Sequence, residues 1–241
     1  MDVVAQPQTA SLGERDVPFI LKRSRRRRSI AFSIDGNGLV VSAPWNASDS
    51  RIRKSMADGA AWIIRKLDEW SGYKPREQRW TDGEQLAYLG NSLTLNIVTD
   101  PVLIPPVLHD QRCLRVTVAN AANEPRIHEA VVGWYRRHAA RNFTDRIGVF
   151  AASMQLPVPK MFLSNARTQW GSCNTRKQVR LNWRLVQAPQ EVIDYVVVHE
   201  LAHLFEMNHS KRFWRIVERH CPEHMEVRKH LNERGHWYLD I

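Results

Sequence analysis

The sequence predicts an α+β protein whose first half is rich in strands and whose second half is mainly helical. Short runs in the first half alternate apolar and polar residues, which is the period of a strand. From Pro125 to about Ser153 the apolar residues instead follow the spacing of a long helix. A further apolar segment after Pro189 predicts a helix that packs against the strands preceding it.

The first elements are predicted from alternation and turn signals. Residues 1–16 are small and polar without a period, so we expect a flexible tail. Residues 17–120 are expected to form a β-rich subdomain. Within it, alternation over residues 30–34 predicts a strand, "DGNG" over residues 35–38 a hairpin turn, and residues 39–42 the returning strand.

One helix is predicted inside this subdomain. Ser48 and Asp49 can cap a helix that runs from about Ser50 to Trp70. Its apolar stripe would consist of Ile52, Met56, Ala60, Ile63, Ile64 and Leu67.

Two more strand signals complete the first half. "GEQLAYLGNSLTLNIV" (83–98) predicts a hairpin that bends at Gly90 and Asn91. "CLRVTV" (113–118) predicts a short strand. The stretch between them, 99–111, holds three prolines and predicts a loop.

Residues 121–241 are expected to form a second domain, which begins with the long helix. Pro125 suits the first turn of that helix. Its core face would consist of Ile127, Val131, Trp134, Tyr135, Ala139, Phe143 and Ile147. Residues 160–166 and 178–186 predict strands, with the polar loop "RTQWGSCNTRK" (167–177) between them.

Three helices are predicted after these strands. Pro189 opens the first, Ser210 can cap a second over residues 211–220, and Pro222 opens a last helix to about Arg234. The first of them carries the principal motif of the sequence.

The composition is that of a soluble globular protein with a basic surface. Hydrophobic residues make up 43% of the 241 residues, which is enough for a sizeable core. The formal net charge is +10, which favours acidic partners such as nucleic acid or nucleotide phosphates. A run of four arginines, Arg25–Arg28, contributes to it, and Arg51, Arg53 and Lys54 follow on the predicted helix.

Cysteine usage and hydropathy indicate a reducing compartment. The three cysteines are far apart, so no disulfide framework is expected. The first residues lack a basic and apolar leader, and we expect no secretory signal. Because no apolar run reaches about 18 residues, no membrane span is expected. The expected location is cytoplasmic.

The stretch "VVVHELAHLFEMNHSKRFW" (196–214) carries the strongest signal for function. His199 and His203 are four apart, so both imidazoles lie on one face of a helix and can reach one ion. Glu200 stands beside them, where it can hydrogen-bond a water on that ion. This H-E-x-x-H pattern is typical of zinc sites in which the glutamate is a general base.

Two residues compete to be the third ligand. If the helix continues unbroken, Glu206 lies on the same face as the two histidines. If the helix ends between residues 207 and 210, His209 can turn back toward the ion. Asn208 tolerates the left-handed conformation that ends helices, and Ser210 can cap a new one, so the chemistry favours His209.

Four segments resemble the YgjP-like metallopeptidase family, a family of predicted metal-dependent hydrolases. They are "RTQWGSC" (167–173), "LNWRLVQAP" (181–189), "DYVVVHELAHL" (194–204) and "NHSKRFW" (208–214). The resemblance begins near residue 17, and a looser similarity extends to the SprT and WLM proteases. It implies a zincin-like catalytic domain, with His199, His203 and His209 as ligands of one Zn²⁺ and Glu200 as base. Glu206 stands in a variable linker of the family.

Further residues are candidates for binding substrate. A peptide could lie along the edge of the strand at 178–186. Arg167, Trp170, Asn182 and Tyr195 are the candidate contacts, and Arg167, Tyr195, His220 and His224 are candidate donors to an oxyanion. Cys173 could line the cleft. Trp170 and Cys173 are equally compatible with ordinary packing.

Three function classes follow from these features. The first is a zinc peptidase with a peptide or protein substrate. The second is a metal-dependent hydrolase of a phosphoanhydride such as a nucleoside triphosphate. The third is a nucleic-acid-associated protein with a structural metal, which would require a fourth protein ligand. Arginines that alternate along a strand point to opposite faces, so in a strand Arg25–Arg28 could not form one flat patch.

Overall fold

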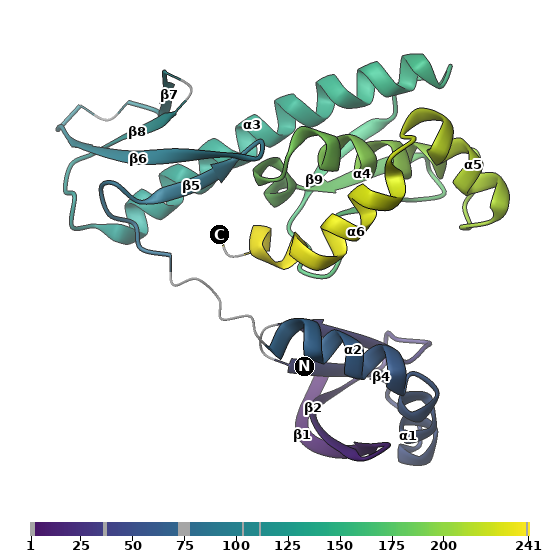
Figure 1. Cartoon of the computed structure of the whole chain (residues 1–241). Helices are drawn as coiled ribbons and strands as arrows, with labels where there is room; N and C mark the ends of the chain where they lie inside the picture. Colours follow the sequence, from purple (N-terminus) through teal and green to yellow (C-terminus); the bar gives the residue numbers. More distant parts are fainter. Residues whose placement is uncertain (1–2, 36–37, 72–77, 103, 111, 240) are drawn as a thin grey trace. The chain divides into compact units, whose positions relative to one another are not determined.

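The computed structural model describes residues 3–35, 38–71, 78–102, 104–110, 112–239 and 241. The chain divides into a first unit, Met1–Arg76, and a second unit, Glu77–Ile241. Helices and strands occur in both units, so the predicted α+β class is confirmed (Figure 1). The division falls after Arg76, whereas the sequence suggested a boundary at residue 120.

The first unit is built on a four-stranded sheet with the order β1-β2-β4-β3. Its strands are β1 (Val3–Leu12), β2 (Arg15–Ser24), β3 (Ala31–Asp35) and β4 (Gly38–Pro44). β1 pairs along its whole length with β2, so the prediction of a flexible tail over residues 1–16 was wrong. β3 and β4 pair antiparallel as predicted, and the middle of the predicted "DGNG" turn, residues 36–37, lies outside the described residues.

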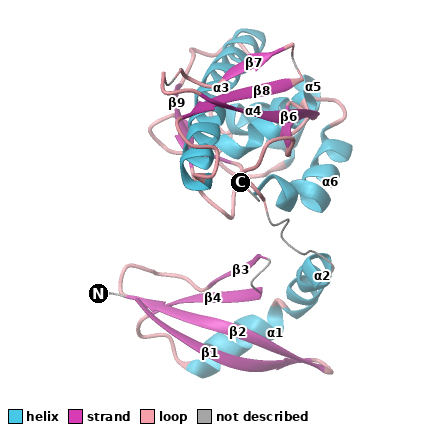
Figure 2. Ribbon diagram, turned by 90° about the vertical axis from the view of Figure 1, so that its left-hand side faces the viewer, coloured by secondary structure: helices cyan, strands magenta, loops and turns pink. Residues whose placement is uncertain are grey.

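Two helices accompany this sheet, where one was predicted (Figure 2). α1 (Asp49–Asp58) is capped by the preceding Ser48, whose side chain accepts a hydrogen bond from the Arg51 amide. α2 (Ala60–Ser71) follows directly, and Gly59 separates the two. Glycine has a low helix propensity, and it ends α1 here. The core between helices and sheet includes Phe19, Leu21, Val41, Ile52, Met56 and Ile63.

The second unit begins with a four-stranded sheet of order β5-β6-β8-β7. Its strands are β5 (Gln85–Tyr88), β6 (Asn91–Thr99), β7 (Val107–His109) and β8 (Cys113–Val118). The predicted β5–β6 hairpin is confirmed, but it bends at Leu89 and Gly90, one residue earlier than the predicted Gly90 and Asn91, because Asn91 is already the first residue of β6. Its turn residues Leu89 and Gly90 both have positive φ, 48° and 77°, as tight two-residue hairpins require. β7 lies within the segment predicted as a loop, so that prediction was wrong over Val107–His109.

The tip of this hairpin binds the segment that leads into the motif helix. The Leu89 amide donates to the Val186 carbonyl at 2.9 Å, and the Gly90 amide donates to the Gln187 carbonyl at 3.1 Å. A Cβ atom at Gly90 would stand 3.0 Å from Pro189. The sheet therefore shares a core with the helical half, which is why the units divide before it and not after it.

The long helix α3 (Glu124–Ser153) was predicted correctly, including its buried face. Asn123 caps its first turn by accepting a hydrogen bond from the Arg126 amide, and Pro125 lies in that turn. All seven predicted core residues, from Ile127 to Ile147, are buried. α3 packs against β8 and also against β9 (Lys160–Ser164) and α4 (Gln190–Ala202), so it supports both the four-stranded sheet and the helical half of this unit (Figure 1).

A three-stranded sheet of order β10-β11-β9 lies next to the motif helix. Its strands are β9 (Lys160–Ser164), β10 (Gly171–Cys173) and β11 (Gln178–Asn182), and the 3₁₀ helix η1 (Trp183–Gln187) follows. The predicted strand over 178–186 therefore ends at Asn182, and the predicted loop contains β10. Because β11 is the central strand, its edge is not open to a peptide, and that prediction was wrong.

The chain ends with α4 (Gln190–Ala202), α5 (Lys211–His220), α6 (His224–Arg234) and the 3₁₀ helix η2 (Gly235–Leu239). α4 is anchored to α3 by a two-bonded ion pair from Arg146 to Asp194, with distances of 2.6 and 2.8 Å. The side chain of Asn142 on α3 also donates a hydrogen bond to the side chain of Gln190 at 2.9 Å. Within the described residues, none of the helices is long and apolar enough to cross a membrane.

Candidate metal centre

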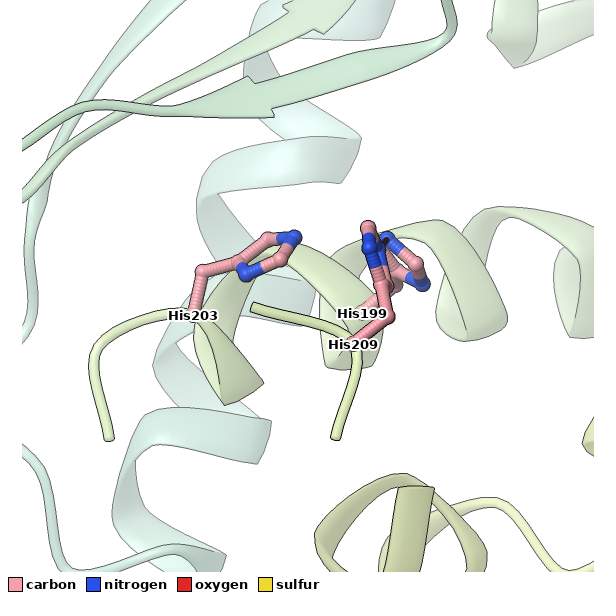
Figure 3. Close-up of side chains that lie close together, drawn as sticks. All are labelled: His199, His203 and His209. Atoms are coloured by element: carbon pink, nitrogen blue, oxygen red, sulfur yellow. Dashed lines mark hydrogen bonds between the residues drawn. The ribbon is translucent and has the colours of Figure 1, made fainter. Parts of the chain in front are cut away.

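Three histidine side chains converge at the C-terminal end of α4 (Figure 3). One ring nitrogen from each of His199, His203 and His209 lies within 4.8 Å of the other two. The Nε2 atoms of His199 and His209 are 3.0 Å apart. Two imidazole nitrogens at ~2.0–2.1 Å from one tetrahedral zinc would be roughly 3.3 Å apart. The spacing therefore fits a single ion.

Helix geometry brings His199 and His203 together. They lie one turn apart, and His203 is the C-cap of α4 with φ −64° and ψ −17°, so its side chain stays on the helical face. The Nδ1 atom of His203 is 3.1 Å from the backbone carbonyl oxygen of Glu206. In the tautomer that donates to this carbonyl, Nε2 keeps its lone pair for a metal. Glu206 thus contacts the cluster through its backbone.

His209 is carried back toward α4 by a turn that starts earlier than the sequence suggested. α4 ends at Ala202, and the amides of Leu204 and Phe205 close the turn by donating to carbonyls in its last turn. Asn208 is not in the left-handed region, contrary to the sequence prediction. Its side chain instead accepts a hydrogen bond from the Ser210 amide at 3.0 Å.

The next helix fixes the position of His209 from the other side. Ser210 caps α5, as predicted, by accepting a hydrogen bond from the Phe213 amide at 3.3 Å. The ring of Phe213 lies 4.9, 4.6 and 4.7 Å from the rings of the three histidines. Phe213 is fully buried, and it forms a rigid apolar support under the whole cluster.

Glu200 lies beside the cluster in a tightly closed environment. Its side chain is only 5% exposed, and its Oε2 atom is buried without a hydrogen-bond partner in the described residues. A Cβ atom at Gly171 of β10 would stand 2.4 Å from Glu200 Oε1. Only glycine leaves room for the carboxylate at this point. We missed Gly171 in the sequence because a close approach between segments gives no local signal.

Burial shifts the proton affinities of this group of residues. It lowers the pKa of His199 to about 3, with smaller contributions from His203, His209 and Arg228. Burial also lowers the pKa of His209, again helped by His203 and Arg228. These two imidazoles are therefore neutral at pH 7 and have lone pairs to offer a cation.

The carboxyl group of Glu200 is shifted in the opposite direction. Burial raises its pKa to about 8, because the charged form loses solvation without gaining a partner. A cation held by the three imidazoles would lower this pKa again by charge attraction. The carboxyl group is therefore suited to exchange a proton near neutral pH.

Arg228 of α6 is a site residue that sequence reasoning missed. Its guanidinium lies 4.9 Å from the centre of the Trp214 ring. The Trp214 ring stacks on the ring of His209 and on the ring of the buried His224, with 5.8 Å between ring centres in both pairs. Arg228 is one turn from His224, which was named as a candidate, so the helical period could have indicated it.

Tyr195 is the predicted contact residue that lies nearest to the cluster. It is one turn before His199 on the same face of α4, and the two rings are 5.9 Å apart. Its hydroxyl group makes no hydrogen bond within the described residues. Burial raises the pKa of Tyr195 to about 12, so the hydroxyl group keeps its proton at neutral pH and can donate it.

Other predicted contact residues are engaged elsewhere. Asn182 is fully buried, and its amide donates to the Ala166 carbonyl at 2.6 Å and accepts from the Arg184 amide at 3.1 Å. Its side chain therefore caps η1 and has no surface for a substrate. Trp170 packs on Gly235 and lies 6.2 Å from the ring of Tyr238. These contacts are those of a packing residue.

Arg167, His220 and Cys173 have separate surroundings. Arg167 is exposed and acts electrostatically on Arg184. His220 shares a hydrogen bond with Ser153 at 3.1 Å. Burial, with a smaller contribution from Glu200, raises the pKa of Cys173 to about 11. Its thiol is therefore protonated and is a poor nucleophile.

Residues 28–234 match the model of one protein family, described as YgjP-like, metallopeptidase domain. The chain belongs to this family. Membership confirms the resemblance seen in the sequence, and it implies a metal-dependent hydrolase of the metallopeptidase type. No curated protein matches the chain.

Two crystal structures of metallopeptidase zymogens are also similar to parts of the chain. Jannalysin of Methanocaldococcus jannaschii is 20% identical, with coverage of 37% of this chain and 96% of its own, at a TM-score of 0.32. Abylysin of Pyrococcus abyssi is 24% identical, with coverage of 42% and 90%, at a TM-score of 0.31.

Proposed function

We propose that the second unit is a zinc-dependent peptidase in which His199, His203 and His209 hold one Zn²⁺ and Glu200 is the general base. The observation that carries this proposal is the convergence of three imidazoles beside a buried carboxylate without a partner. In the described part of the chain, no fourth His, Cys, Asp or Glu joins this cluster. Three protein ligands leave the open position that catalytic zinc sites keep.

The residues of the site have separate tasks in this proposal. When bound, zinc supplies a Lewis acid that polarises a carbonyl group and lowers the pKa of water. Glu200 accepts a proton from the attacking water and passes it to the leaving amine. Glu206 holds His203 through its backbone carbonyl, and its carboxylate is not assigned as a ligand.

Tyr195 is the candidate donor to the oxyanion. Its hydroxyl group has no partner within the described residues, and the ring lies against His199. The raised pKa keeps the hydroxyl group protonated over the neutral range. A donor that is already in place when negative charge develops stabilises the transition state.

A peptide substrate would bind along β10, the edge strand of the sheet beside α4. In the antiparallel β10–β11 pair, the backbone amide of Asn182 donates to the Trp170 carbonyl, and the backbone amide of Asn174 donates to the Gln178 carbonyl. Bonded pairs alternate along such a ladder, so the peptide groups of Gly171 and Cys173 point away from β11. An extended peptide can pair with them as an added strand. Gly171 also touches Glu200, which would bring the peptide to the base.

The proposal is tested by a hydrolysis screen on an unbiased peptide library with zinc-loaded full-length protein. The wild-type chain should cleave a subset of extended peptides, and Glu200→Gln should lose roughly 10²–10⁴-fold in rate, the usual contribution of a general base. Glu206→Gln is the matched control and should cleave at the wild-type rate. Equal cleavage by the wild type and Glu200→Gln would overturn the proposal.

A further inference from the structure

The arginine run Arg25–Arg28 does not lie in a strand, so the strand face that the sequence offered as one interpretation of the run is wrong. β2 ends at Ser24 and β3 begins at Ala31, so the run forms the loop between them. β2 and β4 are parallel neighbours with Ser24 opposite Pro44. Since parallel strands end at the same edge of a sheet, the arginine loop emerges beside the segment that follows β4.

A pocket forms where these two loops meet. We call it the arginine pocket, and it is lined by Arg25, Arg27, Arg28, Arg51, Pro44, Trp45 and Asn46. All four arginines are exposed, and the Trp45 ring is 45% exposed. None of the lining residues is acidic, and none of the four guanidinium groups pairs with a carboxylate within the described residues. The pocket therefore concentrates positive charge around one indole ring.

The shape of the pocket is held by a side chain that does not line it. Arg23 of β2 donates to the Ala47 carbonyl and to Asp49, each at 2.5 Å. The Trp45 amide donates to the Ser24 carbonyl at 3.1 Å, which joins the two loops directly. Arg25 in turn lies 5.5 Å from the centre of the Trp45 ring. The backbone of both loops is thus fixed to the sheet before any ligand binds.

From this arrangement we propose that the arginine pocket binds single-stranded nucleic acid, with phosphates on the guanidinium groups and a base stacked on Trp45. Guanidinium groups bind phosphate through paired hydrogen bonds, and unpaired bases stack on exposed aromatic rings. A duplex presents phosphates but keeps its bases stacked inside, so it would leave Trp45 unused. The pocket lies in the first unit, and its ligand does not depend on the proposed peptidase activity.

The test measures binding of the full-length chain to a labelled oligothymidylate of about 16 nucleotides, the upper site size of single-strand-binding domains. The binding constant should fall as the salt concentration rises. Replacing Arg25, Arg27 and Arg28 by Gln together should make the slope of the log binding constant against the log salt concentration less steep by roughly 2, at about 0.7 for each lost phosphate contact. The matched control replaces Arg112, Arg115 and Arg176 by Gln, which removes the same charge from exposed positions of the second unit and should leave the slope unchanged.

The stacking part is tested with an abasic oligonucleotide of the same length. Trp45→Ala should weaken binding of the oligothymidylate by roughly fivefold to a hundredfold, and Trp45→Phe should retain most of the affinity. Wild type should bind the abasic strand more weakly, and Trp45→Ala should bind both strands equally. Circular dichroism and thermal unfolding show whether each variant keeps its fold.

Several results would overturn the proposal. One is an absence of oligonucleotide binding at low salt. Another is an equal change of the salt slope in the pocket and control triple variants. A third is that the wild type binds the abasic strand as tightly as the oligothymidylate. Tighter binding to duplex DNA, to phosphatidylserine vesicles or to polyglutamate would assign the pocket to another polyanion. Competition by inorganic phosphate or a free nucleotide as strong as by the oligonucleotide would reduce it to a phosphate site.

Discussion

The metal centre and the arginine pocket use polar side chains in opposite ways. At the metal centre, Glu200 is 5% exposed and packs against Gly171. Burial raises the pKa of Glu200 and lowers that of His199, so it favours the neutral form of both side chains. In the arginine pocket, four guanidinium groups are exposed and surround a tryptophan that is 45% exposed. The first region suits proton transfer on a substrate removed from water, and the second suits contact with a solvated polyanion.

The difference predicts how each region responds to mutation. Close packing makes the metal centre sensitive to a single methyl group. The arginine pocket depends instead on total charge and on one ring, so its variants should change affinity without changing the fold.

Gly171→Ala should damage the metal centre. The new Cβ atom would stand 2.4 Å from Glu200 Oε1, so β10 or the carboxylate must move. Overpacking of this kind costs about 1–3 kcal/mol, and hydrolysis should fall with it. Chemical denaturation measures the free energy of unfolding. In a Glu200→Ala background, which removes the carboxylate, the same substitution should cost much less.

A matched control for this prediction lies on α3. A Cβ atom at Gly148 meets nothing within 4 Å, so Gly148→Ala should be neutral or stabilising. Oligonucleotide binding should be unchanged in both glycine variants. An equal loss of unfolding free energy from Gly171→Ala with and without the Glu200 carboxylate would contradict the close contact. A loss of oligonucleotide binding would contradict the functional independence of the two sites.

Arg228→Met should have the smallest effect, because the guanidinium is exposed and screened by solvent. The pKa of His209 is lowered mainly by burial, then by His203 and Arg228, so removing the arginine should raise it. The imidazole of His209 should therefore take up its proton at a higher pH in the metal-free protein. An NMR titration of the metal-free protein across pH measures this shift. The exposed neighbour Lys229→Met is the control, and an equal shift there would contradict a specific role of Arg228.

Periodicity explains what the sequence could predict. The buried face of α3 and the pairing of His199 with His203 depend only on helical spacing within one segment, and both were found in the structure. The β5–β6 hairpin was also predicted, because Gly90 permits the positive φ that such a turn requires, although the turn lies one residue earlier than predicted. The sequence favoured His209 as the third ligand partly because Ser210 could cap a new helix, and Ser210 does cap α5. Asn208, however, contributes through its side chain and not through a left-handed backbone.

Contacts between distant segments explain what was missed. β1 carries a proline and small polar residues, and only its full-length pairing with β2 makes it a strand. Gly171 matters because α4 brings Glu200 against it. The arginine pocket exists because β2 and β4 are parallel, which is a property of the topology. Nothing within residues 25–28 indicates that pairing.

The central claim is that His209, and not Glu206, completes a site for one zinc ion in the second unit. The most direct measurement is a zinc titration of metal-free protein for the wild type, His209→Ala and Glu206→Gln. Wild type and Glu206→Gln should bind one zinc per chain with the same affinity, and His209→Ala should bind it much more weakly. Retention of zinc by His209→Ala together with its loss from Glu206→Gln would contradict this account.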